Sequence, residues 1–155
     1  YKSFLKDDTV YYVSEHRGSY TNKDEIKNLY FKNPDFVIFA ISITRFAAKK
    51  AIEDLFKEGI KVSLVNILWI KPLKISKKSY DNLKESKFGG VVMDDDYTTG
   101  VAKSIANDIN IKTNKKIITM GLKDRTAGTA KRLDNLPPSS NEIYKRIKDI
   151  ISNDV

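Results

Sequence analysis

Three consecutive aspartates, Asp94, Asp95 and Asp96, are the residues in this sequence with the clearest potential for chemistry. They follow residues 89–93, whose glycines and apolar side chains predict a turn and then a strand that ends near Asp94. Carboxylate oxygens are the ligands that Mg²⁺ prefers. Because adjacent side chains do not all point toward one ion, the pattern favours a solvated or interfacial loop over a metal site.

A second candidate follows at once, in Thr98, Thr99 and Gly100. These residues open a predicted helix, whose first N–H groups could bind an anion. A plain helix cap is the simpler interpretation. The chain has no G-x-G-x-x-G or Walker sequence that would strengthen a phosphate site.

Nucleophilic and metal chemistry find little support elsewhere. The chain has no cysteine, which excludes disulfides and thiolate ligands, and a single histidine, His16, within Glu15-His16-Arg17. No G-x-S-x-G elbow is present. The sequence therefore predicts no catalytic, cofactor-binding or metal-ligating residue within the chain.

Composition narrows the class of protein. Of the 155 residues, 41% are apolar and 31% charged, which suits one solvated domain with a real core. The net charge is +8, but the lysines are scattered, so we expect only weak, unspecific nucleic-acid binding. No apolar run approaches the length of a membrane span, and no signal peptide is evident, so we expect a cytoplasmic location without membrane contact. The start at Tyr1 rather than Met predicts a piece of a longer chain.

Strands and helices alternate along most of the chain. The strands are expected at 10–13, 29–31, 36–41, 61–67, 89–93 and 116–120, with a polar linker at 15–27. The helices are expected at 44–58, 76–86, from about Thr99 to 109, and after Pro137-Pro138, where Ser139 and Glu142 form a capping box. This alternation predicts a three-layer α/β/α fold around a mostly parallel sheet of about five strands.

The segment after the strand at 61–67 is apolar where a loop should be polar. It contains Trp69, Ile70, Lys71, Pro72 and Leu73. Pro72 fixes its own φ and restricts Lys71, which suits a corner of the chain. We expect Trp69, Pro72 and Leu73 to be structural, with Trp69 packed under the sheet or against a neighbouring domain. Binding of an anionic ligand by Lys71 is the alternative.

The order of these segments resembles a known family, the C-terminal domain of transketolases, of 1-deoxyxylulose-phosphate synthases and of the beta subunits of 2-oxo-acid dehydrogenase decarboxylases. The resemblance covers roughly residues 29–151, and its most specific part is Lys71-Pro72-Leu73. It also includes the run 35–40, the acidic pair Asp94-Asp95 and the segment 137–143. The family usually has glycine where this chain has Ser42, often has arginine where it has Leu68, and has a double glycine where only Gly100 remains.

The resemblance implies a domain division and a role. Residues 1–28 would be the end of a pyrimidine-binding domain with its linker, and residues 29–155 the C-terminal domain. Thiamine diphosphate and Mg²⁺ would bind between upstream domains of the parent enzyme, so this chain alone would have no catalytic centre or cofactor. It would pack against those catalytic domains and help to form a homo-oligomer. The candidate ligand or interface residues are Asp94, Asp95, Thr98, Thr99, Gly100 and Lys71.

Two other functions remain open on the sequence. One is a free-standing flavodoxin-like module that binds an anionic nucleotide or other phosphate ligand. The other is a nucleic-acid-binding domain that uses the positive charge.

Overall fold

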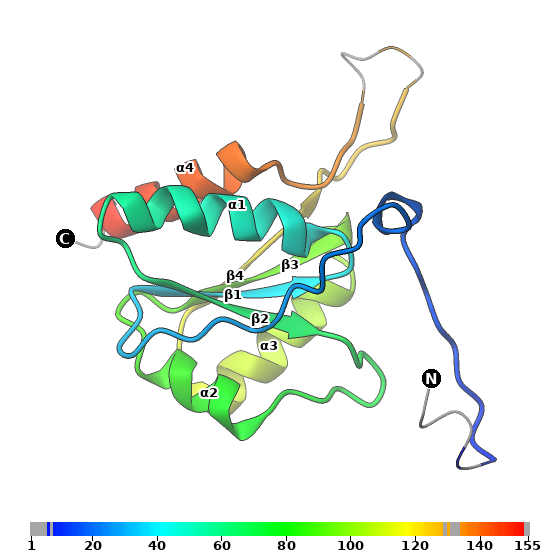
Figure 1. Ribbon diagram of the computed structural model, residues 1–155, viewed down its shortest axis with the longest axis horizontal. Helices are drawn as coiled ribbons and strands as arrows, with labels where there is room; N and C mark the ends of the chain where they lie inside the picture. The colour runs from blue at the N-terminus through cyan, green and yellow to red at the C-terminus, as the bar shows by residue number, and fades with distance from the viewer. Residues whose placement is uncertain (1–5, 7, 129, 131–133, 154–155) are drawn as a thin grey trace.

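A four-stranded parallel sheet forms the centre of the computed structural model, which describes residues 6, 8–128, 130 and 134–153. The strand order is β2-β1-β3-β4, with helices on both faces (Figure 1). The strands are β1 (Phe36–Ile41), β2 (Val62–Ile67), β3 (Gly90–Tyr97) and β4 (Ile117–Leu122). The helices are α1 (Thr44–Lys57), α2 (Lys77–Lys84), α3 (Val101–Thr113) and α4 (Ser140–Asn153), with a short 3₁₀ turn, η1 (Arg17–Ser19). The predicted three-layer α/β/α class is confirmed.

Strand β1 lies between two neighbours and is buried on both faces. It pairs in parallel with β2 and with β3, in a register that joins Phe39 to Val65 and to Val92. Alternate side chains of a strand point to opposite faces of its sheet. Phe36 and Ile38 therefore join the core under α1 and α4, while the intervening side chains join the core under α2 and α3. A continuous apolar run is what such a position requires.

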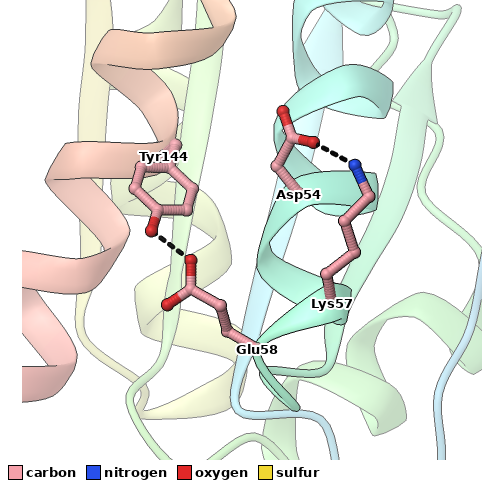
Figure 2. Close-up of polar contacts among 4 residues, drawn as sticks. All are labelled: Asp54, Lys57, Glu58 and Tyr144. Atoms are coloured by element: carbon pink, nitrogen blue, oxygen red, sulfur yellow. Dashed lines mark hydrogen bonds and ion pairs between the residues drawn. The ribbon is translucent and has the colours of Figure 1, made fainter.

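Helices α1 and α4 cover one face of the sheet, side by side (Figure 1). The side chains of Ile143 and Ile147 from α4 are buried between them and the sheet. Polar contacts close the outer side of the pair, because Tyr144 and Lys148 both donate to Glu58 at the end of α1. Figure 2 shows Tyr144 pointing toward Glu58, next to the Asp54–Lys57 ion pair of α1. Both hydrogen bonds lower the pKa of Glu58.

The capping box predicted for the last helix is present. The hydroxyl oxygen of Ser139 accepts from the backbone N–H of Glu142 at 3.3 Å, and a carboxylate oxygen of Glu142 accepts from the N–H of Ser139 at 2.9 Å. These bonds satisfy donors that the first turn of a helix leaves without partners. The backbone N–H and the hydroxyl of Ser139 both donate to the carboxylate of Glu142 and lower its pKa.

Two predicted strands are not formed. Residues 29–31 make only an isolated antiparallel bridge, in which Leu29 and Leu64 exchange two backbone hydrogen bonds of 2.8 Å, so the sheet has four strands instead of about five. The strand predicted at 10–13 was wrong. Its β-branched and aromatic residues suit a strand, but no described strand lies beside them, and Val10 and Tyr12 are 95% and 93% exposed.

Strand β3 is longer than predicted. It continues through the three aspartates to Tyr97, with an irregularity between Met93 and Tyr97 where it faces β4. Gly121 permits the close approach on that side, since a Cβ there would lie 2.4 Å from the carbonyl oxygen of Asp96. The sequence placed the end of the strand too early because three consecutive charged residues are typical of a loop.

No helix among the described residues is long and apolar enough to cross a membrane.

The packing of α4 gives a first test. Ile147 is 1% exposed, so Ile147→Ala should lower the free energy of unfolding by about 2–5 kcal/mol through lost burial and a cavity. Ile111 on α3 is 72% exposed, and Ile111→Ala should change it by less than about 0.5 kcal/mol. Urea unfolding of the two variants measures the difference. Equal effects would contradict the position of α4 on the sheet.

Candidate functional site: the carboxyl edge of the sheet

The strand order places a topological switch point between β1 and β3. From β1 the chain moves outward to β2, and from β3 it moves outward in the other direction to β4. In open α/β sheets, ligands bind in the crevice beyond the carboxyl ends of the strands at such a point. Here that position lies between Ser42, which follows β1, and the aspartates at the end of β3.

Hydrogen bonds join the two strand ends across this point. The hydroxyl of Ser42 donates to Oδ2 of Asp95 at 2.7 Å. The buried hydroxyl of Thr44 donates to the carbonyl oxygen of Ile41 at 2.6 Å and lies 3.4 Å from that of Met93. The side chains of Ser42 and Asp95 therefore satisfy each other where a flavodoxin-like module would hold its ligand, and this alternative is not favoured.

The backbone of Ser42 is left-handed, with φ of +56°. This region favours glycine because other residues bring their Cβ close to a carbonyl oxygen. The hydrogen bond to Asp95 holds the serine in this strained conformation. The sequence marked this position as a serine where the resembled family usually has glycine, at the end of a predicted strand, but it did not indicate the contact with Asp95.

Asp94 is the buried member of the acidic run, with 5% of its surface exposed. Burial, the side-chain interaction with Asp95, and the nearby charges of Asp95 and Asp96 raise the pKa of Asp94 to about 6. The carboxylate of Asp94 accepts from the backbone N–H of Asp95 at 2.9 Å, which only partly offsets this effect. Asp94 is thus held in an environment that disfavours its charge.

The three aspartates do not converge on one point. Asp94 lies inside, Asp95 is bonded to Ser42, and Asp96 is exposed and accepts from the N–H of Tyr97 at 2.7 Å. Within the described part of the chain, no group of three or more His, Cys, Asp or Glu residues is placed to hold a metal ion. These residues do not fit a magnesium–diphosphate group.

The threonines before α3 have a different role from the predicted helix cap. Gly100 is the N-cap of α3, and no side-chain hydrogen bond caps the helix. Thr98 instead joins β3 to β4, because its hydroxyl and its backbone N–H both donate to the carbonyl oxygen of Leu122, at 2.9 and 3.1 Å. Thr99 and Gly100 are exposed at the start of the helix.

The segment 68–73 leaves the sheet at the carboxyl end of β2. Trp69 is half-buried and does not pack under the sheet. The rings of Trp69 and Tyr11 pack in a T-shaped arrangement with their centroids 6.0 Å apart. The Nζ atom of Lys74 lies over the Trp69 ring, 4.1 Å from its centroid. Leu73 packs against the core under α2 and α3, while Lys71 and Pro72 are exposed around a cis peptide bond. The contact with Tyr11 was not foreseen, because the polar linker separates the two aromatic residues in sequence.

Most of the exposed large apolar side chains that the structure describes lie at this end of the molecule. The N-terminal arm (residues 8–20) runs beyond the arrowheads of the strands (Figure 1). The exposed apolar residues come from four places: the arm, the loop after β2, the end of β3 with the start of α3, and the segment after β4. We call their exposed residues the carboxyl-end apolar surface: Val10, Tyr12, Val13, Tyr20, Leu68, Ile70, Tyr97, Val101 and Leu136.

Comparison with known proteins identifies the fold family. The family described as "Transketolase, C-terminal domain" matches residues 28–143. The chain belongs to the transketolase C-terminal domain family. No curated protein matches the sequence.

Two solved structures share the fold of this transketolase C-terminal domain. One is a "split gene transketolase, inactive beta4 tetramer", with a TM-score of 0.60 and 18% identity over 76% of this chain. The other is a 2-oxoglutarate:ferredoxin oxidoreductase from Magnetococcus marinus with 2-oxoglutarate, coenzyme A and succinyl-CoA bound, with a TM-score of 0.54 and 19% identity over 83%. This chain spans 38% of the first protein and 19% of the second.

The raised pKa of Asp94 predicts a pH dependence of stability. The folded state binds this proton more tightly than the unfolded state, so the contribution of Asp94 to stability falls as pH rises from about 4 to 6 and stays low above. Asp94→Asn should therefore raise the free energy of unfolding above that of the wild type by about 1–3 kcal/mol at pH 7.5 and by much less at pH 4.

Urea unfolding of both proteins at the two pH values measures this gain. Asp108→Asn, at an exposed position of α3, is the control and should show no such pH-dependent difference. An Asp94→Asn variant that is equally destabilised at both pH values would contradict the buried, charge-disfavouring environment.

Proposed function

We propose that this chain is the non-catalytic C-terminal assembly domain of a thiamine-diphosphate-dependent enzyme. The carboxyl-end apolar surface is the observation on which the proposal rests. Scattered exposed apolar residues are normal on a soluble protein, but a cluster of them at one end is typical of an interaction site. Membership of the transketolase C-terminal domain family supports the same role.

The composition of the surface suits permanent packing against protein. Tyr12 and Val10 are almost fully exposed, and Leu68 and Leu136 are 75% and 70% exposed. The arm contacts the rest of the domain through the rings of Tyr11 and Trp69, and through the approach of Ile43 to Gly18. A tethered arm with apolar side chains around it provides a broad surface for an upstream catalytic domain or a second subunit.

The parent enzyme would transfer a two-carbon unit or decarboxylate a 2-oxo acid. This is supported by the family and by the printed descriptions of the two structural relatives, one a transketolase and the other an oxidoreductase with 2-oxoglutarate bound. The catalytic domains would supply the thiamine diphosphate and Mg²⁺ site, and the assembled enzyme would be a cytoplasmic homo-oligomer.

A cofactor titration tests whether the cofactor site lies outside this chain. Calorimetric titration of this chain with thiamine diphosphate and Mg²⁺ should give no saturable binding at micromolar concentrations, because the described aspartates do not converge on a metal–diphosphate group. The parent enzyme, assembled from this domain and its catalytic domains, should bind when titrated in parallel. Micromolar binding by the chain alone would overturn the proposal.

Assembly is tested with the natural polypeptide that contains this sequence. Tyr12→Ser combined with Leu68→Ser should raise its subunit dissociation constant by at least about tenfold, since each side chain would contribute about 1.5–3 kcal/mol on burial. Sedimentation velocity over a concentration series measures the constant.

The matched control is Ile111→Ser. Ile111 is also exposed, but it lies near the end of α3, which runs back toward the amino ends of the strands. It should leave the dissociation constant unchanged. The thermal unfolding of the 155-residue chain should be the same for all variants, which separates lost assembly from lost folding. An unchanged constant for the Tyr12 and Leu68 double variant would count against the assembly role.

A further inference from the structure

The two edges of the sheet differ in how their backbone groups are satisfied. The edge at β2 is covered by residues 26–31, through the double hydrogen bond between Leu29 and Leu64. The Asn66 side chain adds a 2.8 Å bond to the carbonyl oxygen of Ile26, and Ser63 accepts from the N–H of Phe31 at 3.0 Å. This edge has little capacity left for another strand.

The edge at β4 is open. Strand β4 pairs with β3 on its inner side, and no strand among the described residues pairs with its outer side. Its sequence, Ile-Ile-Thr-Met-Gly-Leu, contains neither a charge nor a proline, and all six residues are half-buried. Exposed edges are ordinarily protected against pairing by lysine or proline within the strand or by a covering segment, whereas here the nearest lysines, Lys116 and Lys123, lie just outside β4. An apolar, unprotected edge strand is a template for strand addition.

A hollow runs beside this edge, between α3 and β4. It is lined by Lys103, Ala106, Asn107, Asn110, Ile117, Ile118 and Thr119. Side chains of an added strand would point alternately into this hollow and toward the face covered by α4. Ala106 is a small residue of the lining, and the exposed Asn107 can bond to polar side chains of the incoming segment.

The positive charges around the β4 edge favour a binding partner with acidic residues. Lys116 and Lys123 stand directly before and after β4, and Lys103 lies in the hollow. Within the described part of the chain, none of these three lysines forms an ion pair, although the charge of Lys123 acts on the Glu142 carboxylate at the start of α4 and lowers its pKa. A second copy of this chain, paired antiparallel about the middle of β4, would place Lys116 opposite Lys123, and like charges opposite each other are destabilising.

We infer that the outer edge of β4 binds an extended segment of a partner protein that has acidic residues at both ends and alternating apolar and polar residues between them. The segment adds as a fifth strand, and its terminal carboxylates pair with Lys116 and Lys123. This interaction uses a different surface from the carboxyl-end apolar surface and does not depend on the assembly role proposed above.

The test uses the whole chain and two synthetic peptides. One is a short capped peptide with glutamate at both ends and alternating valine and threonine between them, and the other is the same peptide with lysine at both ends. The glutamate-ended peptide should bind by fluorescence anisotropy and protect amides of residues 117–122 from hydrogen exchange. The lysine-ended peptide should bind at least about tenfold more weakly, from two lost and two repulsive surface pairs.

Charge reversal gives the matched control. Lys116→Glu with Lys123→Glu should invert the preference between the peptides, whereas Lys49→Glu with Lys50→Glu, at exposed positions of α1, should preserve it. Equal binding of both peptides, or protection outside residues 117–122, would overturn the inference. So would concentration-dependent protection of residues 117–122 without peptide, which would show that a second copy occupies the edge. Circular dichroism confirms that each variant remains folded.

Discussion

The fold depends on the burial of β1 from both faces and both sides. Its six residues are at most 5% exposed, and it pairs in parallel with β2 along its whole length and with β3 over residues 37–40. A strand in this position has no polar face, so its side chains must serve two separate cores at once. Phe36 and Ile38 hold α1 and α4, while Val37 and Phe39 hold α2 and α3. The layers are therefore joined through a single apolar strand.

Because β1 is buried, the polar groups of the residues that follow it must find hydrogen-bond partners within the protein. Ser42 and Thr44 leave the buried strand and meet the end of β3 through their hydroxyls. Asp94 enters the same region from β3 and is disfavoured as a charged group there. The switch point is thus occupied by the protein's own hydrogen bonds, while the apolar side chains around it face outward. That combination suits contact with protein better than retention of a small anion.

Local pattern was sufficient to predict the layers but not the contacts between distant segments. Apolar periodicity predicted the central strands and helices, and the spacing of Ser139 and Glu142 predicted the cap. The strand at 10–13 failed because a strand needs a partner, which composition does not supply. The extension of β3 through the aspartates depends on β4 and on the space above Gly121. Likewise, nothing near Trp69 in the sequence indicates Tyr11, and nothing near Ser42 indicates Asp95.

The cover over β2 has a mechanical consequence. Residues 26–31 are joined to the edge of the sheet by hydrogen bonds, and Ile26 and Tyr30 pack against the margins of the two cores without belonging to their fully buried residues. Local opening of such marginal segments requires less free energy than global unfolding. We therefore expect this covering segment to open at a lower free energy than the four-stranded sheet. Such opening would let whatever is attached through the arm change its orientation while the central sheet keeps its strand pairing.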